Sequence, residues 1–241
     1  MANQTATAME LDLDERVNNL VTEDDEPVDN IFSAKQQRLL VEPLYSSWAP
    51  PVEEKSDERR VFLADVNVGV FYSIDRPPLV PDFFLSLDVL PDKDWHAKIN
   101  RSYFLWKFGK QPEVVVEIVS NKEGNELGSK LREYARMGVT YYVVFDPFNE
   151  LSEDVLRVYE PGFAQRYRLR GDYSLPNIGL SLMLWKGVFE GLEDTWLRWC
   201  DAEGNLIPTG QERAEQEATA RQKAESELAE LRAEVERLRQ K

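Results

Sequence analysis

The sequence predicts an α/β domain followed by a separate C-terminal helix. Runs of apolar and β-branched residues, typical of buried strands, occupy residues 61–73, 79–87, 113–119 and 140–147. Between the last two runs, apolar residues recur at helical spacing. From Gln211 onward the chain has no glycine, proline or aromatic residue, which predicts an uninterrupted helix.

Charge divides the chain into three segments. The 241 residues carry a net charge of −15 and are 42% hydrophobic, enough for one substantial domain. The first thirty residues hold nine acids against Arg16 alone. We expect a flexible acidic segment over 1–30, a folded domain over 31–210 and a C-terminal helix over 211–241. The acidic balance argues against a general nucleic-acid binder but leaves room for a local basic groove.

Composition also indicates a compartment. No apolar run approaches the roughly 20 residues that cross a bilayer, and the N-terminus lacks the basic start and apolar stretch of a signal peptide. Cys200 is the only cysteine, so an internal disulfide framework is ruled out. We therefore expect a cytoplasmic protein without a membrane partner.

The expected elements follow in chain order. A short amphipathic helix spans 31–43, with Ser33 as its cap. The helix between the two central strands spans 125–139, and Gly138 is its C-cap. The remaining elements are strand-like: 155–160, 165–170, 180–185, and a hairpin over 196–209 that turns at 203–205.

The C-terminal helix carries a heptad seam. Its apolar positions step by four, three, four and three, and charged residues flank them. The seam consists of Ala224, Leu228, Leu231, Val235 and Leu238. It predicts a homodimer or another coiled-coil oligomer. Since about three heptads is short for an independent coiled coil, a single solvated helix stays open as the alternative.

Several classes of chemistry are excluded. With His96 as the only histidine and no nucleophile-elbow motif, a serine hydrolase triad is not indicated. One cysteine and one histidine cannot build a zinc site, and the glycine-rich phosphate-binding motifs are absent from the sequence. Carboxylates, lysines and hydroxyls remain, and carboxylates are hard ligands suited to Mg²⁺ or Mn²⁺.

Two carboxylates stand where apolar residues are expected. Glu117 lies within the strand 113–119, where an unpaired charge would cost several kcal/mol. Asp82 lies near the start of the strand 79–87, after Pro81, which indicates an edge or a bend. If these strands are neighbours, the two acids converge, and a divalent cation would relieve their repulsion.

Lys130 is the third candidate. At 100° per residue it lies on the flank of its helix, from which it could reach the end of the preceding strand and stabilise a phosphate. Glu126 stands four residues earlier, so a plain surface ion pair is the alternative.

The order of these motifs resembles the Uma-type restriction endonuclease family of the PD-(D/E)xK nuclease superfamily. The resemblance covers roughly residues 35–190 and rests on Pro81-Asp82, the EIVS of 117–120, Lys130 and the segment 138–147. The acidic segment and the heptad helix are similar to those of cyanobacterial-type members. The resemblance implies a restriction-endonuclease-like α/β fold, in which helices flank a mixed central sheet.

The resemblance also implies a site. Asp82 and Glu117 would hold Mg²⁺, or Mn²⁺ in its place, together with the backbone carbonyl of Ile118. The superfamily lysine, two residues after the second acid, is replaced here by Val119. Family members place a lysine on the next helix instead, and Lys130 matches it as the third catalytic residue. Ser120 and Glu126 are weaker site candidates.

The implied activity is a metal-dependent DNA endonuclease that hydrolyses phosphodiester bonds with a metal-activated water. The alternative is a catalytically inactive adaptor that keeps the nuclease fold and assembles through its coiled coil. The first function requires Asp82 and Glu117 within reach of one metal ion. The second predicts that the two acids lie apart or are capped by arginine or lysine.

The loop of residues 90–111 is a candidate DNA surface. It interleaves basic and aromatic residues, as nucleic-acid grooves do. The candidate DNA contacts are Lys98, Arg101, Lys107 and Lys110. A packed loop with its lysines in solvent is the alternative.

Overall fold

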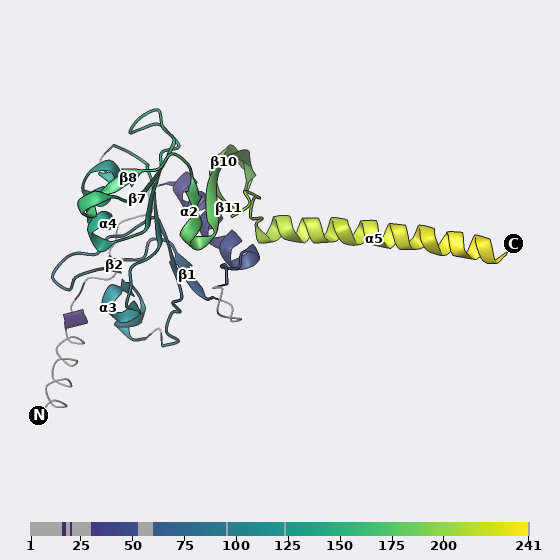
Figure 1. Cartoon of the computed structure of the whole chain (residues 1–241), viewed down its shortest axis with the longest axis horizontal. Coiled ribbons are helices and arrows are strands. Elements are labelled where there is room, and N and C mark those ends of the chain that lie inside the picture. Colours follow the sequence, from purple (N-terminus) through teal and green to yellow (C-terminus); the bar gives the residue numbers. More distant parts are fainter. Residues whose placement is uncertain are drawn as a thin grey trace, which may run out of the picture.

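A six-stranded mixed sheet forms the centre of the computed structural model, which describes residues 16–17, 20, 30–52, 60–94, 96–122 and 124–240 (Figure 1). The strand order is β1-β3-β5-β6-β7-β8. The strands are β1 (Phe62–Asp65), β3 (Phe83–Leu87), β5 (Val114–Ile118), β6 (Tyr141–Phe145), β7 (Leu156–Pro161) and β8 (Tyr167–Leu169). β5 and β6 are parallel, and the other neighbours are antiparallel. The predicted α/β fold with a mixed central sheet is thus confirmed.

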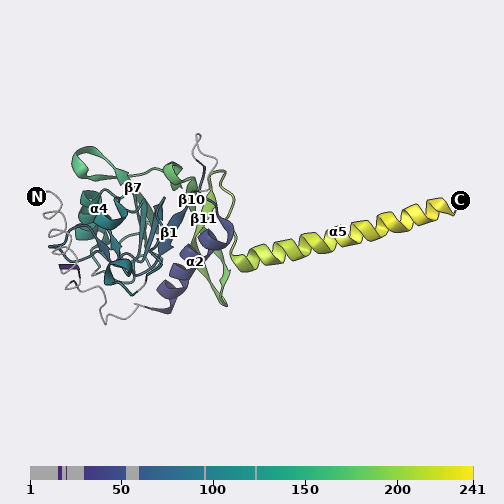
Figure 2. The same cartoon turned by 90° about the horizontal axis from the view of Figure 1, so that it is seen from below.

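One face of the sheet is covered by α2 (Ile31–Ser47) and by the hairpin of β10 (Leu180–Phe189) and β11 (Leu192–Asp201), as Figure 2 shows. The interface is apolar: the Phe83 ring lies 5.6 Å from the Trp199 ring. The Trp199 indole donates to the Leu40 carbonyl at 2.8 Å, so its one polar atom is satisfied within the core.

The other face carries α4 (Leu131–Met137), which is preceded by a π-helical turn, Glu126–Lys130. Because side chains alternate along a strand, Val115, Glu117 and Val119 point to this face. Val115 and Val119 pack in one cluster with Tyr134 of α4. The smaller elements here are β2 (Val70–Phe71), β4 (Tyr103–Phe104) and α3 (Leu105–Phe108). The remaining short strand, β9 (Ser174–Leu175), pairs with β10.

Two expectations about helices are corrected. Ser33 is not the cap of the first helix: the Asn30 side chain accepts a hydrogen bond from the Ser33 backbone N–H at 2.9 Å. The helix also continues past Pro43 to Ser47, since Leu44 on its last turn is buried. The helix expected over 125–139 begins as a π-helical turn, but its C-cap, Gly138 at φ 87°, is confirmed.

Two strand expectations also change. The run 61–73 forms two strands, β1 and β2, because the chain turns at Asn67, which has φ 53°. The hairpin expected around residues 203–205 is present but short: Cys200 and Leu206 form an antiparallel bridge, and the Ile207 N–H donates to the Trp199 carbonyl at 2.9 Å. The main partner of β11 is β10, which pairs with it over ten residues of each strand.

Of the acidic segment 1–30, the structure describes Arg16, Val17, Leu20 and Asn30, and the rest lies outside the described residues. Val17 is buried in a cluster with Phe71 and Phe104. The Arg16 guanidinium donates to Asp75 at 2.6 Å. These contacts attach that point of the segment to the domain.

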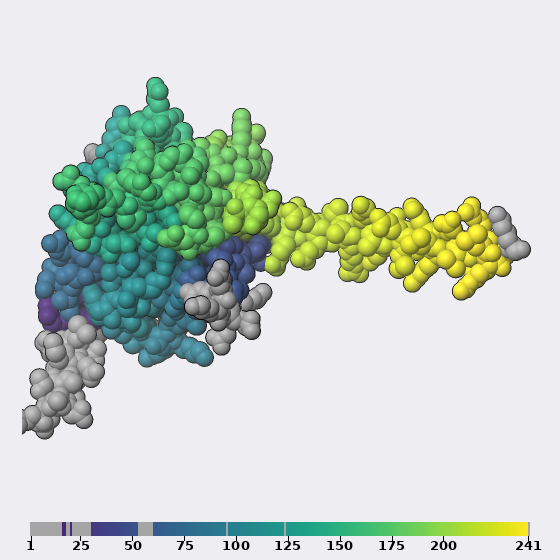
Figure 3. All heavy atoms as spheres, viewed as in Figure 1, coloured from purple at the N-terminus to yellow at the C-terminus, as the bar shows by residue number. Residues whose placement is uncertain are grey.

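The helix α5 (Gly210–Arg239) projects from the domain into solvent (Figures 1 and 3). Thr209 and Glu212 form a capping box at its start. The seam side chains are exposed, with Leu231 at 60%, and their pairing in a coiled coil stays a prediction. Within the described part of the chain, no helix is both long and apolar enough to cross a membrane.

A buried ion pair fixes α5 to the domain. Arg198 of β11 is 1% exposed and donates to both carboxylate oxygens of Glu212, at 2.8 and 2.6 Å. Its guanidinium also lies 4.8 Å from the Trp185 ring and donates to the Ile207 carbonyl. The first turn of α5 is therefore held rigidly against the hairpin.

Removing the acid of this pair should destabilise the fold. Glu212→Ala leaves a buried, uncompensated guanidinium, so we expect the free energy of unfolding to fall by about 3 kcal/mol or more. Urea unfolding followed by circular dichroism measures it. Glu215→Ala, an exposed acid one turn later, is the matched control and should change stability by less than about 0.5 kcal/mol. Equal effects of the two substitutions would contradict the anchoring role.

Candidate functional site

The register of β3 and β5 brings the two buried-strand acids together. Phe83 pairs with Val116 in this antiparallel ladder, so Asp82 stands opposite Glu117 at the next position. Opposed residues of an antiparallel pair point to the same face of a sheet. The Asp82 carboxylate also accepts a hydrogen bond from the Ile118 backbone N–H at 2.7 Å. The two candidate acids therefore share one end of the β3–β5 pair.

Glu117 is buried but fully hydrogen-bonded. It is 1% exposed. One carboxylate oxygen accepts from Lys130 Nζ at 2.8 Å, and the other accepts from the Tyr134 hydroxyl at 2.8 Å. A cation and a hydroxyl thus offset the cost of placing this charge in an apolar sheet.

The π-helical turn places Lys130. A π turn inserts an extra residue compared with an α-helical turn and occurs often at functional sites. It begins after Asn125, which is left-handed at φ 58°, and the Tyr142 hydroxyl donates to the Glu126 carbonyl at 2.9 Å. Lys130 is also 3.8 Å from Glu126, so it contacts both acids, with Glu117 the nearer. Lys130 reaches the end of β5, as expected. The expectation assumed an α-helix with 100° per residue, whereas Lys130 lies on a π-helical turn.

Glu126 is the least satisfied group of this cluster. It is buried, and its Oε2 has no hydrogen-bond partner among the described residues. Gly124 lies directly beside it: a Cβ at that position would come within 1.8 Å of Glu126 Oε1. A buried carboxylate oxygen without a partner needs a reason, and access to a ligand is one.

Asp82 is held from the opposite side by α2. Gln37 Nε2 donates to Asp82 Oδ1 at 2.9 Å. Gln37 and Asn67 exchange two further side-chain hydrogen bonds, at 3.0 and 3.1 Å. The sequence analysis missed Gln37, Asn67 and Tyr134. Of these three residues, only Asn67 could have been found from the sequence. Asparagine tolerates the left-handed backbone conformation, so its place within an apolar run indicates a turn.

The other candidates lie at the same strand end. Ile118 contributes its backbone N–H to Asp82, and a role for its carbonyl stays a prediction. Ser120 lies two residues after the end of β5, is half-buried and accepts a hydrogen bond from the Asn121 side chain at 3.3 Å.

Burial raises the pKa of Glu117 to about 7. The Lys130 charge lowers that pKa in part, and the Asp82 charge raises it. Burial lowers the pKa of Lys130, but Glu117, Glu126 and Asp82 together raise it above its ordinary value. Near neutral pH the site therefore combines a carboxyl close to its titration midpoint with a lysine that stays charged.

The donor set fits a divalent cation of the magnesium type. Mg²⁺ is commonly held by one or two carboxylates, with waters and substrate phosphates completing its shell. Asp82 and Glu117 supply two such carboxylates: burial is the main cause of the raised pKa of Glu117, and the Asp82 charge adds to it. Among the described residues, no group of three or more histidine, cysteine, aspartate or glutamate side chains could enclose a metal ion.

The loop cations are largely engaged within the protein. Lys110 Nζ contacts Glu113 and donates to the Leu87 carbonyl at 2.9 Å. Arg101 donates to the His96 carbonyl at 3.0 Å. Lys98 donates to the Leu20 carbonyl, and Lys107 donates to Asn100. Their contact with DNA stays a prediction.

The aromatic part of that surface is corrected. Tyr103 and Phe104 are buried and pack against Phe108 and Phe71 respectively. Since their faces are covered by other rings, they cannot stack on bases. Trp95 lies outside the described residues.

The pKa of Glu117 predicts a pH-dependent stability. Folding raises it from 4.5 to about 7, so the folded protein holds a proton that the unfolded chain releases in this window. The stabilisation from this proton is complete below 4.5, the pKa of Glu117 in the unfolded chain. It is lost as the pH rises through about 7, the pKa of Glu117 in the folded protein. Glu117→Gln carries no such proton. Its stability relative to wild type should therefore rise by roughly 2 to 3 kcal/mol between about pH 5 and about pH 8.

Urea unfolding of both proteins at the two pH values measures this shift. Glu133→Gln, on the same face but with a lowered pKa, is the control and should show no such rise. If the stability of wild type and Glu117→Gln changed in parallel with pH, the raised pKa would be refuted.

Comparison with known proteins identifies the family of the chain. A family model described as "Uma2: Putative restriction endonuclease" matches residues 16–183. Among solved structures, the chain is similar to "a putative nuclease belonging to DUF820 from Anabaena variabilis ATCC 29413", at 14% identity and a TM-score of 0.38, over 64% of this chain and 73% of that one. No curated protein sequence matches the chain at a significant level. Because the family model spans well over half of the sequence, including both acids and Lys130, this chain belongs to the Uma2 family of putative restriction endonucleases.

Proposed function

We propose that this protein is a metal-dependent DNA endonuclease, a hydrolase of phosphodiester bonds. The observation that carries the proposal is the convergence of Asp82, Glu117 and Lys130 at one end of the β3–β5 pair. Carboxylates can hold the metal ion that assists phosphodiester hydrolysis, and a lysine can stabilise the charge that develops on the phosphate. The family description, restriction endonuclease, supports DNA as the substrate.

Asp82 and Glu117 would hold Mg²⁺ or Mn²⁺, with the Ile118 carbonyl as a third ligand. When bound, the cation would polarise the phosphate and lower the pKa of a water molecule. Gln37 and the Ile118 N–H fix the Asp82 carboxylate in place. Tyr134 does the same for Glu117, so neither acid has to reorganise when substrate arrives.

Lys130 acts as a cation in this proposal, and not as a general base. Its raised pKa keeps the ammonium group charged at neutral pH. At 31% exposure it is accessible from solvent, where it can contact a phosphate oxygen and stabilise the charge that develops there. The pKa of about 7 belongs to Glu117 without a cation, and a bound cation would favour its ionised form.

A second function is favoured by a different observation. Lys130 already neutralises Glu117, as expected for an inactive adaptor that keeps the fold, and α5 presents an unpaired apolar seam. For either function we propose that α5 forms a parallel two-stranded coiled coil with a second copy. The seam has Val235 at an a position and leucines at d positions, a combination that favours parallel dimers.

Flanking charges favour the same orientation. In a parallel pair, Glu227 of one helix would face Arg232 of the other, and Glu234 would face Arg239. In an antiparallel pair, the glutamates would instead face glutamates and the arginines would face arginines. Opposite charges stabilise the first arrangement, and like charges destabilise the second.

The nuclease proposal is tested by plasmid nicking with Mg²⁺ or Mn²⁺. We expect wild type to nick DNA, and Asp82→Asn and Glu117→Gln to lose about 100-fold or more in rate. Asp154→Asn removes an exposed carboxylate outside the site and is the control that should keep full activity. Equal nicking by wild type and both site variants would indicate a contaminant. No nicking by any protein would favour the adaptor.

The dimer is tested by sedimentation equilibrium. Leu231→Asp places a charge in the seam, so we expect a dimeric wild type and a monomeric variant. Ala233→Asp introduces the same charge on the outer side of α5 and should leave the dimer intact. A monomeric wild type at micromolar concentration would refute the coiled coil.

A further inference from the structure

A basic groove lies along the outer side of α4, the helix that begins directly after Lys130. Its volume is about 480 Å³. One wall is α4 and the other is the turn that leads into β8, and Figure 1 shows these elements next to each other. The lining residues are Leu131, Arg132, Ala135, Arg136, Ala164, Gln165, Arg166 and Tyr167.

Three arginines give this groove a positive charge. Arg132 and Arg166 are exposed, and neither side chain forms a hydrogen bond or an ion pair with the described residues. Arg136 pairs with Glu133 three residues before it and is 55% exposed. A surface pair of that kind is weak and gives way to a stronger anion. The groove thus offers three guanidinium groups with little internal compensation.

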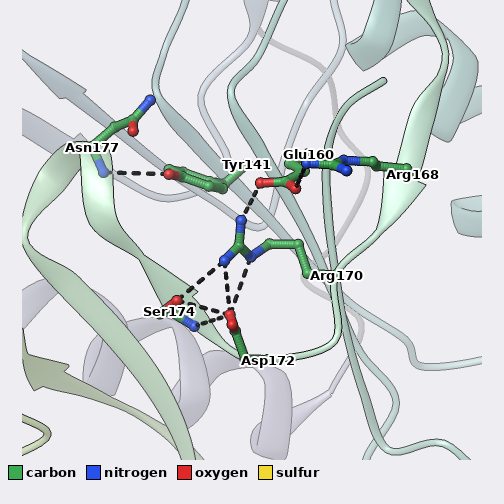
Figure 4. A network of polar contacts seen from close by, with 7 residues as sticks. All are labelled: Tyr141, Glu160, Arg168, Arg170, Asp172, Ser174 and Asn177. Carbon is green, nitrogen blue, oxygen red and sulfur yellow. Dashed lines mark hydrogen bonds and ion pairs between the residues drawn. The ribbon is translucent and has the colours of Figure 1, made fainter. Parts of the chain in front are cut away.

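Neighbouring arginines are neutralised, in contrast. On and just after β8, Arg168 pairs with Glu160 at 2.6 Å, and Arg170 contacts both Glu160 and Asp172 (Figure 4). Ser174 also holds Asp172 in place in this network. The unneutralised charge in this region is therefore concentrated in the groove.

The turn that forms the second wall is strained and carries an exposed aromatic ring. Ala164 and Gln165 have φ values of 55° and 53°, a left-handed conformation that non-glycine residues rarely adopt. The turn presents Phe163 at 94% exposure directly before them. Strained backbone is found often at functional sites, and an exposed ring close to positive charge can stack on a base.

The groove and the candidate site are joined through the chain at the start of α4, although no acid of the site lines the groove. Leu131 lines it and follows Lys130, whose ammonium group contacts Glu117. Arg132 and Arg136 are four residues apart, about 6 Å along the helix axis. Each DNA strand carries one phosphate per 3.4 Å along the DNA axis. The distance between Arg132 and Arg136 therefore corresponds to about two phosphate steps of one strand.

We propose that this groove binds the phosphate backbone of the DNA on which the candidate site acts. Arg132, Arg136 and Arg166 contact phosphates, and Phe163 stacks on a base where the strand is unpaired. This assignment rests on the proposed function, because it takes DNA as the substrate. It adds a surface that positions the DNA strand relative to Lys130.

The test measures the affinity for a fluorescein-labelled DNA duplex of about 30 base pairs, and for the corresponding single strand, by fluorescence anisotropy in EDTA. We expect Arg132→Gln/Arg136→Gln/Arg166→Gln to weaken binding about tenfold or more at low salt and to flatten the plot of log K against log salt by about 2 to 3. The matched lysine variant, Arg132→Lys/Arg136→Lys/Arg166→Lys, keeps the charges and should keep that slope.

A charge-matched control separates the groove from general electrostatics. Arg221→Gln/Lys223→Gln/Arg237→Gln removes three exposed positive charges from α5 and should leave affinity and slope unchanged. Phe163→Ala should weaken binding to the single strand about fivefold or more. Thermal unfolding of each variant verifies that it is folded.

The outcomes distinguish this assignment from the proposed function. If wild type binds DNA and the glutamine groove variant binds with the same affinity and slope, the groove is refuted while the nuclease proposal stands. If the α5 variant loses as much affinity as the groove variant, the groove assignment fails as well. If wild type binds neither DNA at low salt, both proposals fail.

Discussion

The buried contact between Glu117 and Lys130 determines how the chain is built around it. A carboxylate buried in the sheet is stabilised by a cation on the same face, and Lys130, on the connection from β5 to β6, provides one. That connection takes an unusual path, with a left-handed Asn125 and a π turn, so that Lys130 reaches the strand end. The local backbone thus follows from one electrostatic requirement.

This contact is not explained by stability. Replacing a buried ion pair with apolar residues of similar volume is often neutral or stabilising. On the opposite face of the sheet the core is apolar. It includes Phe83, Val116 and Trp199, which pack together without a charged group. Two acids and a lysine on one face, beside a third carboxylate with an unsatisfied oxygen, form the kind of cluster that is found at sites of chemistry or recognition.

The sequence predicted the parts of this arrangement that depend on local pattern. Apolar β-branched runs located β3, β5 and β6, and a charge within such a run identified Glu117. The antiparallel register then placed Asp82 beside it, as expected for neighbouring strands. The partners that hold the acids depend on tertiary structure: Gln37 lies 45 residues from Asp82 and looks like any polar residue of an amphipathic helix. The groove was missed for the same reason, since Arg132 and Arg166 meet only when β8 packs near α4.

The contact of Lys130 with Glu117 is compatible with both proposed functions. The two partners of Glu117, Lys130 and Tyr134, differ in how freely they can move. Tyr134 lies on the buried face of α4, against the sheet, and cannot leave Glu117 without opening the core. Lys130 has a flexible four-carbon side chain that is partly in solvent, so it can exchange its contact with Glu117 for one with a phosphate. A carboxylate oxygen also has more than one lone pair, so a hydrogen bond does not exclude a second ligand. The site therefore has one fixed partner and one exchangeable partner for its central acid, and that asymmetry is what a site that admits an anionic substrate needs.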